Sequence, residues 1–367
     1  MVYNEGFDLN ICAVGDISLA YYSNNNAICD DDVSKYLHNA DLVLANMEYV
    51  VKDNYIRSEE ICLVESPSSV KTLKDLGIEV VSLANNHIVD YGTEGLLCTK
   101  NTLEKYGIKY CGAGINEDEA RKPVIIYKRG KTVAIFGRIL DECFEEAAPI
   151  VARRDKFGAA KLTYEDIDEC VRDYRSKADY MIMFVHWGMQ LMNNHSNKME
   201  RVGEYLRKSG FDIVFGSHAH VIQGVSDAIY YGLGNFYFHP IPHNQFLGGL
   251  LYGPRYKRNR ISEIAVVGLK DGKVGFSSLQ MIYQDVDEIV KFLPNKYASK
   301  YVKNIFGKWS KFSLAYYQYE WRCRSVGLWL HNILVAVESY NTRTLLFLLT
   351  KGFVKLLIQI VNPKTLG

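Results

Sequence analysis

Three of the nine histidines in this 367-residue sequence directly follow apolar runs that have the length of buried strands. His186 ends the run DYMIMFVH, and His218 and His220 follow FDIVFGS as a His-x-His pair. Because the carboxyl ends of parallel strands meet at one edge of an α/β sheet, we expect these imidazoles on one rim, with His218 and His220 facing one side of an extended segment. Each histidine alone is better explained as a loop residue. Their repetition favours a metal site.

Oxygen ligands follow three further apolar runs. Asp16 comes after Leu9–Val14, Glu48 after Leu42–Ala45, and Asn86 after Val80–Ala84. Taken singly, Asp16 and Asn86 would more often cap a turn and Glu48 would be a solvated acid. A dinuclear phosphoesterase site requires such a set of carboxylate, amide and imidazole ligands, because its two ions clamp the phosphate and activate water. The candidate metal ligands are Asp16, Glu48, Asn86, His186, His218 and His220.

The elements that must position these residues alternate between strand and helix, which is typical of an α/β fold. Arg129-Gly130 and Asp271-Gly272 each separate two apolar runs and predict hairpins, so the sheets are expected to be mixed. Residues 138–160 have no clear period and are expected to form a surface excursion beside the site. The predicted helices are Asp30–His38, one capped by Ser66 and closed by Gly77, Thr93–Tyr106 with Thr93 as its cap, Thr163–Lys177 and Asn197–Ser209.

Composition and charge divide the chain into two parts. With 48% apolar residues the chain can bury one large core with an appendage. Residues 295–367 carry 11 Lys and Arg against two acids, a net charge of +9, while residues 1–294 carry −8. Eight cysteines without a Cys-x-x-Cys pair, together with an N-terminus that does not resemble a secretory signal, favour a cytoplasmic protein with reduced thiols. We therefore expect one large domain at 1–290 and a basic, aromatic-rich helical extension at 295–367.

Leu345–Val361 predicts a basic amphipathic helix, because Lys351, Lys355 and Gln359 recur every four residues in an apolar run. A spanning helix needs ~20 apolar residues without central charges, so this one is expected to lie flat. It could rest on an anionic membrane surface or bind a membrane synthase, which would make the protein peripheral to the membrane. Equally, it could fold back onto the preceding domain. No nucleic-acid partner is expected.

Seven motifs follow one another along the chain. They are GD at Gly15-Asp16, NME at Asn46–Glu48, SLANNHIVDYGTEG at Ser82–Gly95, GAG at Gly112–Gly114, HWG at His186–Gly188, GSHAHVIQ at Gly216–Gln223 and YGLGNFYF at Tyr231–Phe238. In this order they resemble the CapA/PgsA family of bacterial capsule and poly-γ-glutamate biosynthesis proteins, which is related to the calcineurin-like metallophosphoesterases. The resemblance covers Leu9–Phe238 and not the residues after Pro294. It implies a calcineurin-like four-layer α/β/β/α sandwich with a C-terminal helical extension.

The resemblance also implies roles for single residues. Asp16 and His220 would bind one metal, Asn86, His186 and His218 the second, and Glu48 would bridge them. His87 would be the general acid or transition-state donor. Asn46 and Asn235 would orient ligands or contact substrate. The nitrogen-rich set implies one or two divalent ions, with Zn or Mn expected.

Two departures from the family pattern affect the expected function. Ser18 stands where phosphoesterases have a ligating histidine, and Gln190 stands where the family commonly has Glu. His87 favours a hydrolase acting on a phosphate ester or on an anionic polymer. Ser18 and Gln190 favour the alternative, a non-catalytic metal- or polymer-binding assembly factor that docks to a membrane synthase. An amidase that cleaves γ-glutamyl links with the same activated water is a third, weaker hypothesis.

Overall fold

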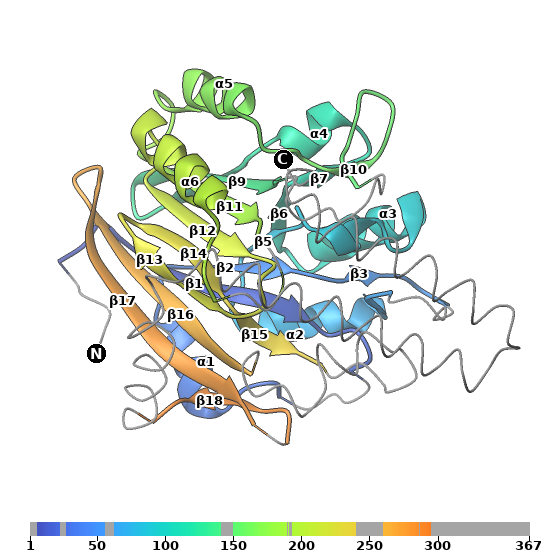
Figure 1. The fold of residues 1–367 in the computed structure, drawn as a ribbon. Helices are drawn as coiled ribbons and strands as arrows, with labels where there is room; N and C mark the ends of the chain where they lie inside the picture. Colours follow the sequence, from blue (N-terminus) through green and yellow to red (C-terminus); the bar gives the residue numbers. More distant parts are fainter. Residues whose placement is uncertain are drawn as a thin grey trace, which may run out of the picture. The chain divides into compact units, whose positions relative to one another are not determined.

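The computed structural model describes residues 6–22, 27–55, 62–140, 150–188, 190, 193–239, 260–285 and 287–294 (Figure 1). The chain divides into two units, Met1–Val302 and Lys303–Gly367. The predicted amphipathic helix and the rest of the extension at 295–367 lie outside the described residues. Within the described ranges, no helix has both the length and the apolar character needed to cross a membrane.

Two mixed β-sheets form the centre of the first unit (Figure 1). The first sheet runs in the order β18-β17-β16-β1-β2-β5-β6, with β15 also paired to β1, and the second runs β13-β14-β12-β11-β9-β8. The first contains β18 Val290–Phe292, β17 Lys273–Gln284, β16 Ile261–Lys270, β1 Leu9–Ser18, β2 Leu42–Met47, β5 Val80–Ser82, β6 Lys109–Cys111 and β15 Asn235–Phe238. The second contains β13 Ile222–Ser226, β14 Ile229–Leu233, β12 Ile213–Ser217, β11 Tyr180–His186, β9 Lys131–Ile139 and β8 Val124–Lys128. Two small sheets pair β3 Val50–Val51 with β4 Val64–Glu65, and β7 Ala113–Gly114 with β10 Gly158–Ala159.

Parallel pairing dominates the part of each sheet that leads to the histidines and carboxylates. β1 is parallel to β2 and β15, and β11 is parallel to β9 and β12. The antiparallel pairs include the two predicted hairpins, β8 with β9 and β16 with β17. Arg129, Gly130, Asp271 and Gly272 all have positive φ, as two-residue hairpin turns require. The prediction of mixed sheets is therefore confirmed.

The strands are buried on both faces, which explains why they are continuously apolar in sequence. In β1, Ile11 and Ala13 pack in the cluster between the two sheets, whereas Cys12 and Val14 pack in the cluster on the other face. In β11, Ile182 packs between the sheets and Met183 on the opposite side. Each sheet thus shares one apolar layer with its partner and has a second on its outer face.

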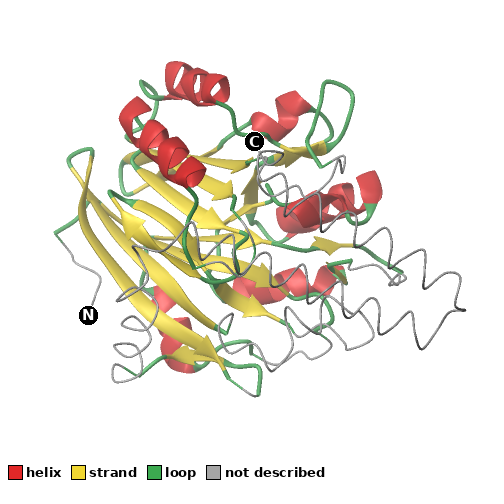
Figure 2. Cartoon of the chain, viewed as in Figure 1, coloured by secondary structure: helices red, strands yellow, loops and turns green. Residues whose placement is uncertain are grey.

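Helices cover those outer faces (Figure 2). The apolar sides of α1, α2 and α3 pack in the cluster outside the first sheet, and those of α5 and α6 pack outside the second. α6 begins after the capping residue Ser196 and spans the predicted Asn197–Ser209. The helices are α1 Asp31–His38, α2 Val70–Asp75, α3 Gly92–Lys105, α4 Glu117–Arg121, α5 Tyr164–Tyr174 and α6 Asn197–Ser209, with short 3-10 helices η1 Pro67–Ser69 and η2 Asn86–Val89.

Two local expectations are wrong. Thr93 lies inside α3 and does not cap it, because the helix begins at Gly92 after Tyr91. The expected surface excursion from residue 138 begins in the core, because Arg138 is fully buried in β9. Its guanidinium donates from Nε to Asp166 Oδ2 at 2.6 Å, which compensates the buried charge. Residues 141–149 of this segment lie outside the described ranges.

Candidate metal centre

The end of β1 positions Asp16 through a close approach of two backbones. A Cβ on Gly15 would lie 1.8 Å from the carbonyl oxygen of Gly234, so only glycine fits there. The Asp16 amide donates to that same carbonyl at 2.9 Å. Asp16 is also the register partner of Asn235 in the parallel β1–β15 pair. Gly15-Asp16 and Gly234-Asn235 therefore lie side by side in the structure.

Glu48 follows β2 and is fully buried. Asn46 Nδ2 donates to Asp16 Oδ1 at 2.8 Å and to Glu48 Oε2 at 3.4 Å, so one amide orients both carboxylates. Glu48 Oε1 accepts no hydrogen bond. Burial, followed by the nearby charges of Asp16 and Asp90, raises the pKa of Glu48 well above its ordinary value. A carboxylate oxygen buried in this way is what a bound cation would satisfy.

His186 ends β11 beside Ser217 at the end of β12, which confirms that these runs are neighbouring parallel strands. After Ser217 the chain leaves the strand. His218 and His220 have φ values of 88° and 57°, in the left-handed backbone region that residues other than glycine seldom adopt. The expectation of an extended His-x-His segment is therefore wrong. Backbone held in this way is found where a functional site is fixed by its surroundings.

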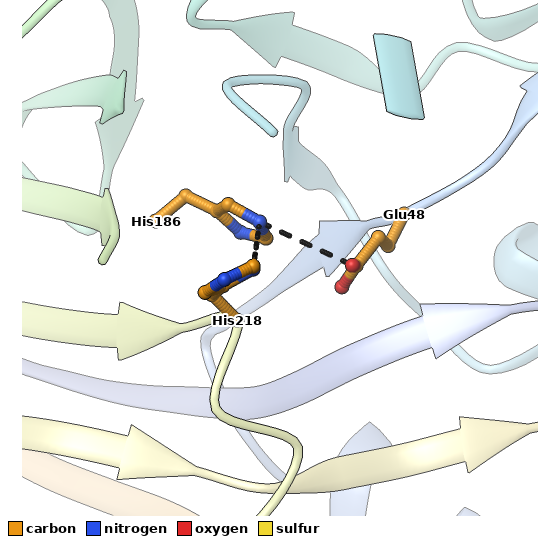
Figure 3. Close-up of side chains that lie close together, drawn as sticks. All are labelled: Glu48, His186 and His218. Carbon is orange, nitrogen blue, oxygen red and sulfur yellow. Dashed lines mark hydrogen bonds and ion pairs between the residues drawn. The ribbon is translucent and has the colours of Figure 1, made fainter. Parts of the chain in front are cut away.

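One group of candidate ligands gathers around His186. Its Nε2 lies 2.8 Å from Asn86 Oδ1, 2.9 Å from His218 Nδ1 and 4.0 Å from Glu48 Oε1. Figure 3 shows both imidazoles and the carboxylate turned toward one another. Burial lowers the pKa of His186 well below its ordinary value and that of His218 to about 3, with neighbouring imidazoles contributing. Both rings are therefore neutral, as metal ligands must be.

A second group consists of Asp16, Glu48 and His220, all buried. His220 Nε2 lies 3.6 Å from Glu48 Oε1, and its Nδ1 lies 3.3 Å from Asp16 Oδ2. Asp16 Oδ2 also accepts from the His218 amide at 3.2 Å. Glu48 is thus common to both groups, in the position that a bridging carboxylate would need.

The donor set fits divalent cations. The structure brings all six candidate ligands from the sequence into the two groups that share Glu48. Nitrogen ligands at ~2.0–2.1 Å from a tetrahedral ion would lie about 3.3 Å from one another. The separations of 2.8–4.0 Å around His186 bracket that value. These buried groups could therefore bind one or two metal ions.

His87 lies beside Asn86 on η2 and has a different partner. Asn85 caps η2 and accepts from the His87 amide at 3.2 Å. His87 Nδ1 pairs with Asp90 Oδ2 at 2.8 Å, and the same oxygen accepts from the Leu63 amide at 2.7 Å. With Nδ1 held by a carboxylate, Nε2 is the nitrogen that can exchange a proton with a bound molecule.

The remaining expected residues divide into two kinds. Asn46 and Asn235 contact candidate ligands directly, since Asn235 Oδ1 lies 2.8 Å from His220 Nδ1. Ser18 is buried two residues beyond Asp16, and its hydroxyl has no hydrogen-bond partner. Gln190 is half-buried in a turn. In the described part of the chain, no hydrogen bond or ion pair joins Ser18 or Gln190 to the candidate ligands.

Sequence reasoning gave no individual role to three residues that hold the site together. Ser217 Oγ lies 2.9 Å from His186 Nδ1, Asp90 pairs with His87, and Asn85 Nδ2 donates to Met47 O at 2.8 Å. All three lie within one to three residues of a candidate histidine or amide in the quoted motifs. Short polar side chains in such positions often orient a neighbouring group, and this was the available signal.

Comparison with known proteins identifies the family. The family model described as "Bacterial capsule synthesis protein PGA_cap" matches residues 10–240 of this chain. The match covers more than half of the sequence and every candidate site residue. The chain therefore belongs to the PGA_cap family of bacterial capsule synthesis proteins, which confirms the family resemblance.

Individual relatives agree with this assignment. The chain is 30% identical over 255 residues to the capsule biosynthesis protein CapA of Bacillus anthracis, covering 64% of this chain and 61% of that protein. It is 29% identical over 209 residues to the PGA biosynthesis protein CapA of Bacillus subtilis (strain 168), covering 54% and 53%. The chain thus spans between half and two thirds of the length of these curated relatives. Among solved structures, a hypothetical protein from Thermus thermophilus matches 78% of this chain and all of its own, with a TM-score of 0.47 and 17% identity.

Proposed function

We propose that this chain is a divalent-metal hydrolase of the phosphoesterase type, with a calcineurin-like four-layer sandwich, that acts in the production of a capsule or another cell-surface polymer. The observation that carries the proposal is Glu48. It is a fully buried carboxylate shared by two groups of candidate ligands, and its Oε1 accepts no hydrogen bond. No Lys or Arg forms an ion pair with it among the described residues. A bound cation is the partner that this carboxylate lacks.

Charge and proton chemistry support a phosphate ester as substrate. Divalent ions bound here would polarise a phosphoryl oxygen and activate water. Asp16 and Glu48 carry about −2 when ionised, so two divalent ions would leave the centre net positive and attractive to an anion. His87, with Asp90 behind it, is suited to hold a proton at Nε2 and deliver it to the leaving oxygen.

The biological role is proposed from the relatives' names. CapA of Bacillus anthracis is a capsule biosynthesis protein, and CapA of Bacillus subtilis is a PGA biosynthesis protein. We propose that this chain acts on an anionic polymer or on a phosphate-ester intermediate of such a pathway. The basic extension at 295–367 would bring it to a membrane surface or a membrane synthase.

One observation favours a second candidate function. Ser18 replaces a ligating histidine of the phosphoesterase pattern, and its buried hydroxyl has no hydrogen-bond partner. The group of Asp16, Glu48 and His220 then has three protein ligands. A metal held there could serve polymer binding or assembly without turnover.

Metal content and hydrolysis of bis(p-nitrophenyl) phosphate separate the two functions. A hydrolase should carry metal and turn over. Glu48→Ala should lose both, and His87→Ala should keep the metal and lose rate. His38→Ala is the matched control, because His38 is exposed on α1. Bound metal without turnover of any phosphate ester would favour the assembly role, and absence of metal from the purified full chain would refute both.

A further inference from the structure

The described chain around His87 contains a single Lys or Arg. Residues 48–55, 62–66 and 85–95 include the small β3–β4 sheet, η2 and the start of α3, and Lys52 is the only Lys or Arg in these three stretches. The acidic residues in the same stretches are Glu48, Asp53, Glu65, Asp90 and Glu94. An anionic molecule that approaches His87 along these stretches therefore has one cationic side chain with which to pair.

Hydrogen bonds connect the strand that leads to Lys52 with the carboxylate that holds His87. The Leu63 amide donates to Asp90 Oδ2 at 2.7 Å, and the Leu63 carbonyl accepts from the Val50 amide at 2.8 Å. Lys52 lies two residues beyond Val50, an advance of ~6–7 Å along an extended chain. β3 also lies beside α3, which follows η2 (Figure 1). Lys52 is therefore on the side of the metal centre where His87 would deliver a proton to the leaving group.

The ammonium of Lys52 has a partner that a bound molecule can replace. Nζ donates to Glu94 Oε2 at 2.6 Å and lies 5.7 Å from the centre of the Tyr91 ring. The side chain of Glu94 is 81% exposed, whereas that of Lys52 is 22% exposed. Because exposed ion pairs are weak and an ammonium has three N–H donors, a carboxylate of a bound molecule can share Nζ with Glu94 or displace it. The Tyr91 ring would hold the ammonium in place during this exchange.

We propose that Lys52 is a specificity-determining residue that binds a carboxylate on the leaving group of the substrate, in exchange for Glu94. This inference rests on the proposed function and narrows its substrate class to phosphate esters whose leaving group is itself anionic. The carboxylate of Glu94 shows that such a group fits against Nζ. Because the substrate carboxylate would compete with Glu94, the two residues have opposite effects. Lys52 favours an anionic leaving group, and Glu94 opposes it.

The test uses the full chain loaded with Mn²⁺ and two esters, phenyl phosphate and 4-carboxyphenyl phosphate, which differ by one carboxylate on the leaving group. The measured quantity is the ratio of kcat/KM for the carboxylated ester to that for phenyl phosphate. Lys52→Gln should lower this ratio by ~2–5-fold through KM, and Glu94→Gln should raise it by a similar factor. In wild type, ~1 M NaCl should move the ratio toward that of Lys52→Gln. Lys71→Gln is the matched control and should leave the ratio unchanged, because Lys71 forms an exposed ion pair with Asp75, also at 2.6 Å, on α2.

The same ratio in wild type and Lys52→Gln would overturn the inference. A lower ratio in Glu94→Gln would also overturn it, because loss of a purely structural ion pair would affect both variants alike. Calorimetric titration with the two esters gives the ratio of their Kd values without any turnover. A wild type that binds both esters and hydrolyses neither would refute the hydrolase, and the Kd ratios of the variants would still decide the role of Lys52. Binding of neither ester would refute both.

Discussion

Replacing Glu48 with Gln should have opposite effects on stability with and without metal. In the metal-free chain the carboxylate is fully buried and its Oε1 accepts no hydrogen bond. The neighbours of that oxygen are His220 Nε2 at 3.6 Å and His186 Nε2 at 4.0 Å. In Glu48→Gln, an amide N–H₂ at this position removes the buried charge and can donate to His220 Nε2. Because an unsatisfied buried polar atom costs about 1–3 kcal/mol, the metal-free variant should gain roughly that much free energy of unfolding.

The pH dependence of the free energy of unfolding tests the predicted stabilisation by Glu48→Gln in a second way. Burial raises the folded-state pKa of Glu48, so the folded protein retains this proton when the unfolded chain, with a pKa near ~4.3, has lost it. The stability contributed by the protonated form is therefore present below pH ~4.3 and is lost as pH rises toward the folded-state pKa. The advantage of Glu48→Gln should consequently be larger at pH 8 than at pH 5.

With metal bound, wild type should be more stable than Glu48→Gln. A ligand present at ~100 times its Kd stabilises the folded state by about 2.7 kcal/mol, and loss of the shared carboxylate should remove most of this at either subsite. Urea unfolding of both proteins at pH 8, with EDTA or with Mn²⁺, measures the two effects. If Glu48→Gln destabilises the metal-free chain by 1 kcal/mol or more, or responds to Mn²⁺ as wild type does, the argument from the buried carboxylate is refuted.

Three further predictions follow from single contacts. His218 has a folded-state pKa of about 3 and an unfolded value near ~6.5, so below pH 6.5 this residue should lower the free energy of unfolding of the metal-free chain by ~1.4 kcal/mol per pH unit. Urea unfolding of His218→Asn should lack this contribution to the pH dependence, and an unchanged pH dependence would contradict a buried, neutral His218. Gly15→Ala places a Cβ 1.8 Å from Gly234 O and should cost ~2–3 kcal/mol and reduce Mn²⁺ binding, whereas a variant with unchanged thermal stability and affinity would argue against the close backbone approach. Asp90→Asn should lower phosphodiester hydrolysis by ~10²–10⁴-fold with metal content unchanged, and full activity would show that Asp90 does not support His87 as a proton donor.

That the candidate ligands lie close together could be predicted from the sequence, because their placement depends on a simple geometric rule. Parallel strands are long apolar runs, and a polar residue that ends such a run must lie at the strand's carboxyl edge. The structure adds that Asp16 and His186 end strands of different sheets, and that both sheets contribute to one site. The hairpins at Arg129-Gly130 and Asp271-Gly272 could also be predicted from the sequence, because their turns need two successive residues with positive φ and glycine adopts such values easily.

What the sequence could not supply depends on contacts between distant segments. The left-handed backbone at His218 and His220 has no local signal such as glycine at either position. The burial of Arg138 follows from Asp166, which lies 28 residues further along the chain. Ser217 and Asp90 orient histidines only because the fold supplies the geometry. Residue types indicated the candidate ligands, whereas the side chains that orient them could be identified only from the structure.

The central claim, a metal centre built around Glu48, is tested most directly by the metal content of the full chain. The chain would be equilibrated with Mn²⁺, separated from free metal by gel filtration and analysed by mass spectrometry, beside Glu48→Gln and the control His38→Ala. Wild type and the control should retain one or two ions per chain and Glu48→Gln should retain few or none. Equal retention by all three proteins, or by none, would contradict the account.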